Sequence, residues 1–227
     1  MKRLIFSGIF LLITAATYAV VQVSQKPQEK CITVVYDSSR KLEDALKVFE
    51  QFREFKRIFV EMNGYSSGQL ERCQANFIMN TEFDNRVPKR LIEDFLSSRQ
   101  NVVWMGYNIW SLGEQLNSKL GLRYMGSFSK VSFDRCIFFY HGRSTHCSHP
   151  GLSMHPETIP TNETKVEIMA ETRIRGRELT PYLVRSKNLY YLADVNFGNV
   201  FQDFLSEFVG ASPGKKILRV QTVAGPG

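Results

Sequence analysis

The chain has 227 residues, of which 43% are hydrophobic and 22% charged, so it can bury the core of one large or two small domains. Its 12% aromatic content and ordinary glycine and proline counts exclude a disordered or fibrous chain. The formal net charge of +7 is spread along the sequence, without basic runs interleaved with aromatics. Composition therefore predicts no nucleic-acid partner.

The first residues carry the pattern of an export signal. Lys2 and Arg3 precede an apolar stretch over residues 4–23 that no acidic residue interrupts. This pattern is typical of a signal peptide over residues 1–23, and about 20 apolar residues are also enough for an uncleaved membrane anchor. Both alternatives predict an exported chain that is periplasmic or held at the outer face of the inner membrane. Only this segment would touch the membrane.

Residues 24–30 form a polar linker, and strand and helix patterns alternate after it. Strands are predicted at residues 32–36, 57–61, 77–80 and 102–106, and helices at residues 42–52, 88–96 and 109–120. Because β-α-β order requires crossover connections, we expect an α/β fold with three layers (α/β/α). Its sheet would be mostly parallel and flavodoxin-like, and would begin with the strand order 2-1-3.

From Gly121 onward strand patterns follow one another without helices between them. The predicted strands are residues 131–140, 166–172, 182–186 and 189–194, and a last helix covers residues 200–209. Since no linker divides the chain, we expect an antiparallel C-terminal extension of the same sheet within one domain, residues 31–212. Residues 213–227 are predicted to form a poorly ordered tail.

Four stretches resemble a known family: residues 34–38 (VVYDS), 76–85 (NFIMNTEFDN), 102–110 (VVWMGYNIW) and 189–194 (LYYLAD). They are similar to the N-terminal domain of bacterial secreted proteins with a C-terminal polysaccharide-deacetylase-like barrel (domain of unknown function 2334). That domain in turn resembles the class I glutamine-amidotransferase fold. The resemblance implies a role near cell-envelope glycan metabolism, with a glycan or a deacetylase-like domain as partner.

The chain departs from that family in two places. Residues 221–222 are Gln-Thr where the barrel would supply an acidic pair, and the 15 remaining residues cannot form a barrel of roughly 200. An amidotransferase also needs a nucleophilic Cys at a tight strand-to-helix turn, but the matching residues 105–109 (MGYNI) contain neither Cys nor Ser. We therefore expect a non-catalytic binding or accessory domain without a cofactor.

Polar and aromatic side chains follow the predicted parallel strands, at the edge where open α/β sheets bind ligands. The candidate ligand-binding residues are Asp37, Asn80, Asp84, Asn85, Tyr107, Asn108 and Trp110. An exposed aromatic ring such as that of Trp110, flanked by carboxylates and amides, suits a saccharide. Two alternatives stay open. The side chains could cap turns and helices, or Asp37, Asp84 and Asn108 could converge as the site of an envelope hydrolase or deacetylase.

Four cysteines in an exported chain indicate disulfides. Their positions favour Cys31–Cys73, before neighbouring strands, and Cys136–Cys147, which a two-residue hairpin turn at residues 141–142 sets opposite each other. All four histidines lie between residues 141 and 155, close to the second pair. Their spacing matches no zinc motif, so no metal site is predicted.

Overall fold

The computed structural model describes residues 30–37, 39–129, 137–146, 154–161, 166–173, 180–195 and 199–210. Every helix and strand described below belongs to one compact unit that begins at Cys31. The predicted export segment and the predicted tail lie outside the described residues. In the part of the chain that is described, no helix is long and apolar enough to cross a membrane.

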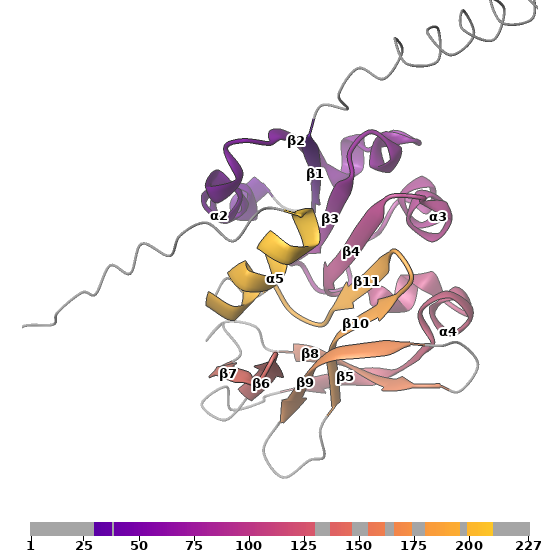
Figure 1. The fold of residues 1–227 in the computed structure, drawn as a ribbon. Coiled ribbons are helices and arrows are strands. Elements are labelled where there is room, and N and C mark those ends of the chain that lie inside the picture. The colour runs from indigo at the N-terminus through magenta and orange to yellow at the C-terminus, as the bar shows by residue number, and fades with distance from the viewer. Residues whose placement is uncertain are drawn as a thin grey trace, which may run out of the picture. The chain divides into compact units, whose positions relative to one another are not determined.

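Nine strands form one mixed sheet of order β2-β1-β3-β4-β11-β10-β9-β6-β7 (Figure 1). Their bounds are β1 Cys31–Tyr36, β2 Lys56–Glu61, β3 Ala75–Asn80, β4 Asn101–Gly106, β6 Ile137–Tyr140, β7 Arg143–His146, β9 Glu167–Arg173, β10 Thr180–Ser186 and β11 Leu189–Leu192. The strands from β2 to β11 in this order run parallel, and the others pair antiparallel. A mixed α/β sheet with the predicted order 2-1-3 and an antiparallel extension is confirmed.

Two features of the second half differ from the sequence prediction. β11 belongs to the parallel part, because it pairs with β4 in parallel register from Leu189↔Val102 onward. A separate antiparallel ribbon, β5 (Leu122–Ser129) with β8 (Met154–Pro160), was not predicted. Its strands carry Gly126, Pro156 and Pro160, which are unfavourable inside strands and hide the strand pattern.

Four α-helices accompany the strands within the described residues: α2 (Ser39–Phe49), α3 (Lys89–Ser97), α4 (Gln115–Leu120) and α5 (Asn199–Val209). The helix predicted over residues 109–120 is divided into a 3₁₀ turn, Ile109–Leu112, and α4. Gly113 separates them with φ 56° and ψ −136°, a conformation that lies outside the helical region.

Helices lie against both faces of the parallel strands (Figure 1). The Phe77 ring of β3 lies 4.7 Å from Phe49 of α2 and 5.0 Å from Phe208 of α5. Trp104 of β4, whose ring lies 5.4 Å from Phe95 of α3, pairs with Ile78 and therefore points to the face opposite Phe77. Aromatic contacts thus fix α2 and α5 on one face and α3 on the other.

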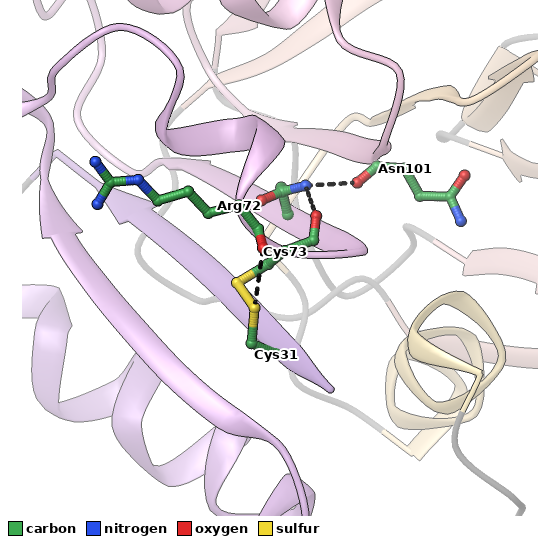
Figure 2. Close-up of a disulfide and its surroundings, with 5 residues drawn as sticks. Cys31, Arg72, Cys73 and Asn101 are labelled. Atoms are coloured by element: carbon green, nitrogen blue, oxygen red, sulfur yellow. Dashed lines mark hydrogen bonds between the residues drawn. A yellow bond between two sulfur atoms is a disulfide. The ribbon is translucent and has the colours of Figure 1, made fainter. Parts of the chain in front are cut away.

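A disulfide joins the amino-terminal ends of β1 and β3 (Figure 2). Cys31 and Cys73 are both buried, and their Cα atoms lie 5.0 Å apart. The neighbouring Asn76 side chain donates hydrogen bonds from Nδ2 to the carbonyl oxygens of Cys73 (3.0 Å) and Asn101 (3.2 Å), which ties this corner to β4. The predicted Cys31–Cys73 pair is confirmed.

The hairpin at the far edge has the predicted two-residue turn. His141 (φ 48°) and Gly142 (φ 72°) connect β6 to β7 with Tyr140↔Arg143 paired. The Tyr140 hydroxyl donates to Glu207 Oε2 of α5 at 2.7 Å, so the hairpin is held against that helix. The register continues to Ile137↔His146, one position short of Cys136 and Cys147. These two cysteines lie outside the described residues, and their bridge stays a prediction.

Candidate functional site

The carboxyl ends of β1 and β3 adjoin at the point where the strand order reverses, which is where open α/β sheets bind ligands. In this protein, hydrogen bonds connect the segments that follow these two strands. The carboxylate of Asp37, just after β1, accepts hydrogen bonds from Thr81 N, Thr81 Oγ1 and Glu82 N, each at 2.8 Å. Burial raises the pKa of Asp37, while the bonds from Glu82 and Thr81 lower it. Asp37 therefore acts as an anchor for the loop that follows β3.

Asn108 holds the same loop from the other side. It is fully buried, has a left-handed backbone (φ 62°), and donates from Nδ2 to the Glu82 carbonyl oxygen at 3.0 Å and to Asn80 Oδ1 at 3.5 Å. Two buried polar atoms of this pair, Asn80 Nδ2 and Asn108 Oδ1, have no hydrogen-bond partner among the described residues. One donor and one acceptor are thus left for an ordered water or a ligand hydroxyl.

The turn after β4 is pinned to β3. A Cβ added at Gly106 (φ 78°) would overlap the Asn80 carbonyl oxygen, which accepts a 2.9 Å hydrogen bond from Tyr107 N. Trp104 Nε1 donates to the Tyr107 carbonyl oxygen at 2.9 Å. Hydrogen bonds therefore hold this turn in place, and residues 105–109 carry the buried Asn108 amide but no Cys or Ser.

Four aromatic rings contact one another in sequence, beginning with Tyr107 of this turn, and we call them the aromatic row: Tyr107, Phe83, Trp110 and Tyr124. Consecutive ring centroids lie 5.6, 5.3 and 5.0 Å apart. Tyr107 is buried, whereas Trp110 is half-buried and packs against the core. Phe83 is 44% exposed and presents the most open ring of the row. Sequence reasoning chose Trp110 and missed Phe83, although an aromatic residue inside the polar run NTEFDN was the available signal.

The remaining candidates lie on the loop that Asp37 and Asn108 hold. Asp84 is exposed with φ 58°, and Asn85 is half-buried. Neither side chain forms a hydrogen bond with another described residue. The structure thus joins Asp37, Asn80 and Asn108 through one loop and joins Tyr107 and Trp110 through the aromatic row. It leaves Asp84 exposed and Asn85 half-buried on the same loop.

A second buried carboxyl group lies close by and was not among the predicted site residues. Asp194 follows β11, next to β4, and is 2% exposed. It accepts hydrogen bonds from Val195 N at 2.7 Å and from the Tyr182 hydroxyl at 3.4 Å. Burial raises its pKa to about 7, and the two hydrogen bonds oppose that shift. The sequence contained a signal for this residue, because Asp194 ends the strand-like run LYYLAD in the same way that Asp37 ends VVYD.

Asp37 and Asn108, two of the three residues of the hydrolytic alternative, both face the loop after β3. Both oxygens of Asp37 are engaged by Thr81 and Glu82, and the Asn108 amide is directed at the backbone of the same loop. Over the described residues no group of three His, Cys, Asp or Glu side chains could hold a metal ion. Cys136, Cys147 and His149, and the side chains of His146 and His155, lie outside that part of the chain.

The fold is similar to solved structures, although no protein-family profile and no curated protein matches the sequence. A catalytic mutant of Gan42B, a GH42 β-galactosidase from G. stearothermophilus, aligns with 82% of this chain at a TM-score of 0.57 and 14% identity. This chain spans only 30% of the length of that enzyme. A ThuA-like protein from Bacteroides uniformis aligns at a TM-score of 0.57 and 11% identity, over 81% of this chain and 91% of its own.

A glutamine amidotransferase from Methylobacillus flagellatus aligns over 72% of this chain and 66% of its own, with 13% identity. Its TM-score of 0.31 is too low to indicate a shared fold. The likenesses at 0.57 establish an α/β fold of the type seen in the ThuA-like protein and in part of the β-galactosidase.

Proposed function

We propose that this chain is an exported, non-catalytic domain that binds saccharide at the carboxyl edge of its parallel strands. It would have the three-layer, amidotransferase-like form that the family resemblance implies, and would serve envelope glycan metabolism beside a deacetylase-like partner. The observation that supports this proposal most is the exposed Phe83 ring, which contacts the rings of Tyr107 and Trp110. A supported, open ring offers a flat apolar face to a sugar and loses little freedom when a ligand covers it.

Polar groups suited to sugar hydroxyls lie beside that ring. Asp84, next to Phe83 in the chain, has an exposed side chain without a hydrogen-bond partner among the described residues. The loop that carries both is fixed at its base by Asp37 and Asn108. Fixing the loop lowers the conformational entropy that binding would cost. A β-galactosidase among the structural neighbours is consistent with a glycan role, without assigning any of its activity to this chain.

Binding of the purified chain to a panel of soluble oligosaccharides tests this proposal. The panel includes chitotetraose, galactotetraose, tetragalacturonate and its methyl ester, with titration calorimetry as the readout. Phe83→Ala should weaken binding of the retained oligosaccharide about five- to tenfold, because a stacked ring contributes on the order of 1 kcal/mol. Thermal unfolding should shift little, since Phe83 is largely open.

Phe139→Ala is the matched control, because Phe139 is 39% exposed on β6, in the antiparallel part of the sheet. That variant should bind as the wild type does. A panel from which no oligosaccharide binds, or equal loss in both variants, would remove the basis for this function.

A further inference from the structure

A cationic hollow lies at the same edge of the sheet as the aromatic row. Its volume is about 420 Å³, and it is lined by Asn63, Arg86, Pro88, Lys89 and Arg90. Asn63 follows β2, Arg86 and Pro88 lie in the loop between β3 and α3, and Lys89 and Arg90 begin α3. Three of the five lining side chains are positively charged and none is acidic. Such a recess concentrates positive potential and attracts anions.

The three cations of the hollow differ in what already engages them. Arg90 Nη2 donates to the Asn63 carbonyl oxygen at 3.2 Å, which orients its guanidinium across the hollow. Lys89 Nζ lies 3.5 Å from Glu93 Oε1 in an exposed pair that stabilises little. Arg86 forms no ion pair or side-chain hydrogen bond with any other described residue. Its guanidinium therefore keeps its donors available for a planar or tetrahedral anion.

The hollow and the aromatic row share one loop. Phe83 and Arg86 are three residues apart, so their Cα atoms are separated by at most about 11 Å. Asp37 and Asn108 hold the start of that loop at Thr81 and Glu82, directly before Phe83. An oligosaccharide over Phe83 can therefore extend toward the cations within a few sugar units.

We propose that the hollow formed by Arg86, Lys89 and Arg90 receives an anionic substituent, a carboxylate or phosphate, of the saccharide bound at Phe83. The inference rests on the proposed saccharide function for its ligand class, and on the hollow itself for the anion. Arg86 supplies the principal contact, because its guanidinium is the one of the three that no other described side chain or carbonyl engages. The domain should then prefer acidic glycans to neutral ones.

Three probes separate the anion contact from the sugar contact. They are tetragalacturonate, its methyl ester, which lacks the negative charges, and inorganic phosphate, which lacks the sugar. Each is titrated by calorimetry against the wild type, Arg86→Gln, Phe83→Ala and Arg99→Gln. Arg99 is exposed just beyond the other end of α3, so the last variant removes the same charge away from the hollow.

The wild type should bind tetragalacturonate about fivefold or more tightly than the ester, and a tenfold rise in salt should reduce that preference. Arg86→Gln should remove the preference and weaken phosphate binding, while Arg99→Gln keeps both. Phe83→Ala should weaken both saccharides and leave phosphate binding unchanged.

The possible failures are distinguishable. Equal binding of acid and ester by the wild type, or an unchanged preference in Arg86→Gln, overturns the anion contact while the saccharide function stands. Phosphate binding that depends on Arg86, without binding of either saccharide, supports the hollow and overturns the saccharide function. Competition between the two anions identifies the substituent. If tetragalacturonate displaces phosphate at equal concentration, the natural substituent is a carboxylate; if phosphate displaces tetragalacturonate, it is a phosphate.

Discussion

At the scale of single residues, Asp37 shows how a side chain in a typical ligand position serves the scaffold instead. It ends β1 at the switch in strand order, yet both of its oxygens are engaged by Thr81 and Glu82. The loop between β3 and α3 carries Phe83 and Arg86, so the proposed binding surface depends on a carboxylate that does not itself face the ligand. Position at a strand end therefore does not distinguish an anchor from a ligand-binding group.

Replacing Asp37 should be costly. Asp37→Ala leaves the N–H groups of Thr81 and Glu82 without their acceptor, and the free energy of unfolding should fall by about 2–4 kcal/mol. Urea unfolding followed by circular dichroism measures this change. Asp84→Asn is the control, since Asp84 is exposed on the same loop and Asn tolerates its positive φ; its effect should stay within about 0.5 kcal/mol. Equal effects of the two variants would contradict the anchoring role.

Asp194 makes a pH-dependent contribution. Its pKa is raised by burial from 3.8 to about 7, so the folded state binds its proton more tightly than the unfolded state does. The stability that this group contributes is full below about pH 4 and is lost as the pH rises through about 7. Asp194→Asn imitates the protonated acid and should remove that loss.

The variant should match the wild type near pH 4 and exceed its unfolding free energy near pH 8 by a few kcal/mol. Denaturant unfolding across this pH range measures the difference in unfolding free energy between the variant and the wild type. The contributions of the other carboxyl groups are nearly the same in both proteins and largely cancel in that difference. A difference that is independent of pH would show that Asp194 titrates normally.

At the scale of elements, the end of β4 leaves no room for a side chain between neighbouring strand ends. Gly106 sits against the Asn80 carbonyl oxygen and near Val195, so the ends of β3, β4 and β11 meet at a residue without a side chain. This close approach places Asn80 and Asn108 within hydrogen-bond distance of each other. The geometry of the candidate site is therefore set by one glycine as much as by its polar groups.

Gly106→Ala should destabilise the fold by more than about 3 kcal/mol, because the added methyl group forces strand ends apart in addition to the cost of a positive φ. Gly68→Ala separates these two causes. Gly68 has a similar φ of 83°, but nothing lies within 4 Å of an added Cβ, so about 1 kcal/mol is expected. Thermal unfolding of the two variants measures both losses of stability. Similar losses would mean that the lack of room for a methyl group at Gly106 adds nothing to the cost of its positive φ.

At the scale of the whole domain, one covalent link joins segments that are distant in sequence. Cys31 and Cys73 are 42 residues apart and connect β1 to the residues just before β3. Closing a loop of that length restricts the unfolded chain, and the chain-entropy relation gives a stabilisation of roughly 4 kcal/mol. The double variant Cys31→Ser with Cys73→Ser should therefore unfold at a clearly lower urea concentration.

Reductant provides the control for this prediction. It should lower the unfolding midpoint of the wild type toward that of the double variant, and any remaining effect on the variant reports on Cys136 and Cys147. If Cys31 is alkylated in unreduced native protein, the bridge is absent in solution and the prediction fails.

Local patterns in the sequence predicted the first half of the domain well. Apolar periodicity located β1, α2, β2, β3, α3 and β4, because each buries a regular face. The parallel pairing of β11 with β4 was not predictable, since it joins residues far apart and a short apolar run carries no information about its partner. For the site, the strand-end position identified Asp37, Asn80 and Asn108. The hydrogen bonds of Asp37 and Asn108 to the Glu82 backbone, and the bond from Asn108 to Asn80 Oδ1, depend on loop geometry that side-chain identity does not encode.

The pairing of β11 with β4 also constrains how the protein is made. Leu189 pairs with Val102, 87 positions earlier, so almost the entire domain must leave the ribosome before the parallel sheet is complete. Until then β4, buried from Val102 to Gly106 in the finished fold, has an open apolar edge. Such edges pair readily with other chains, and contacts of large sequence separation form slowly. We therefore expect the unfinished edge of β4 to favour aggregation of this chain until β11 is available to pair with it.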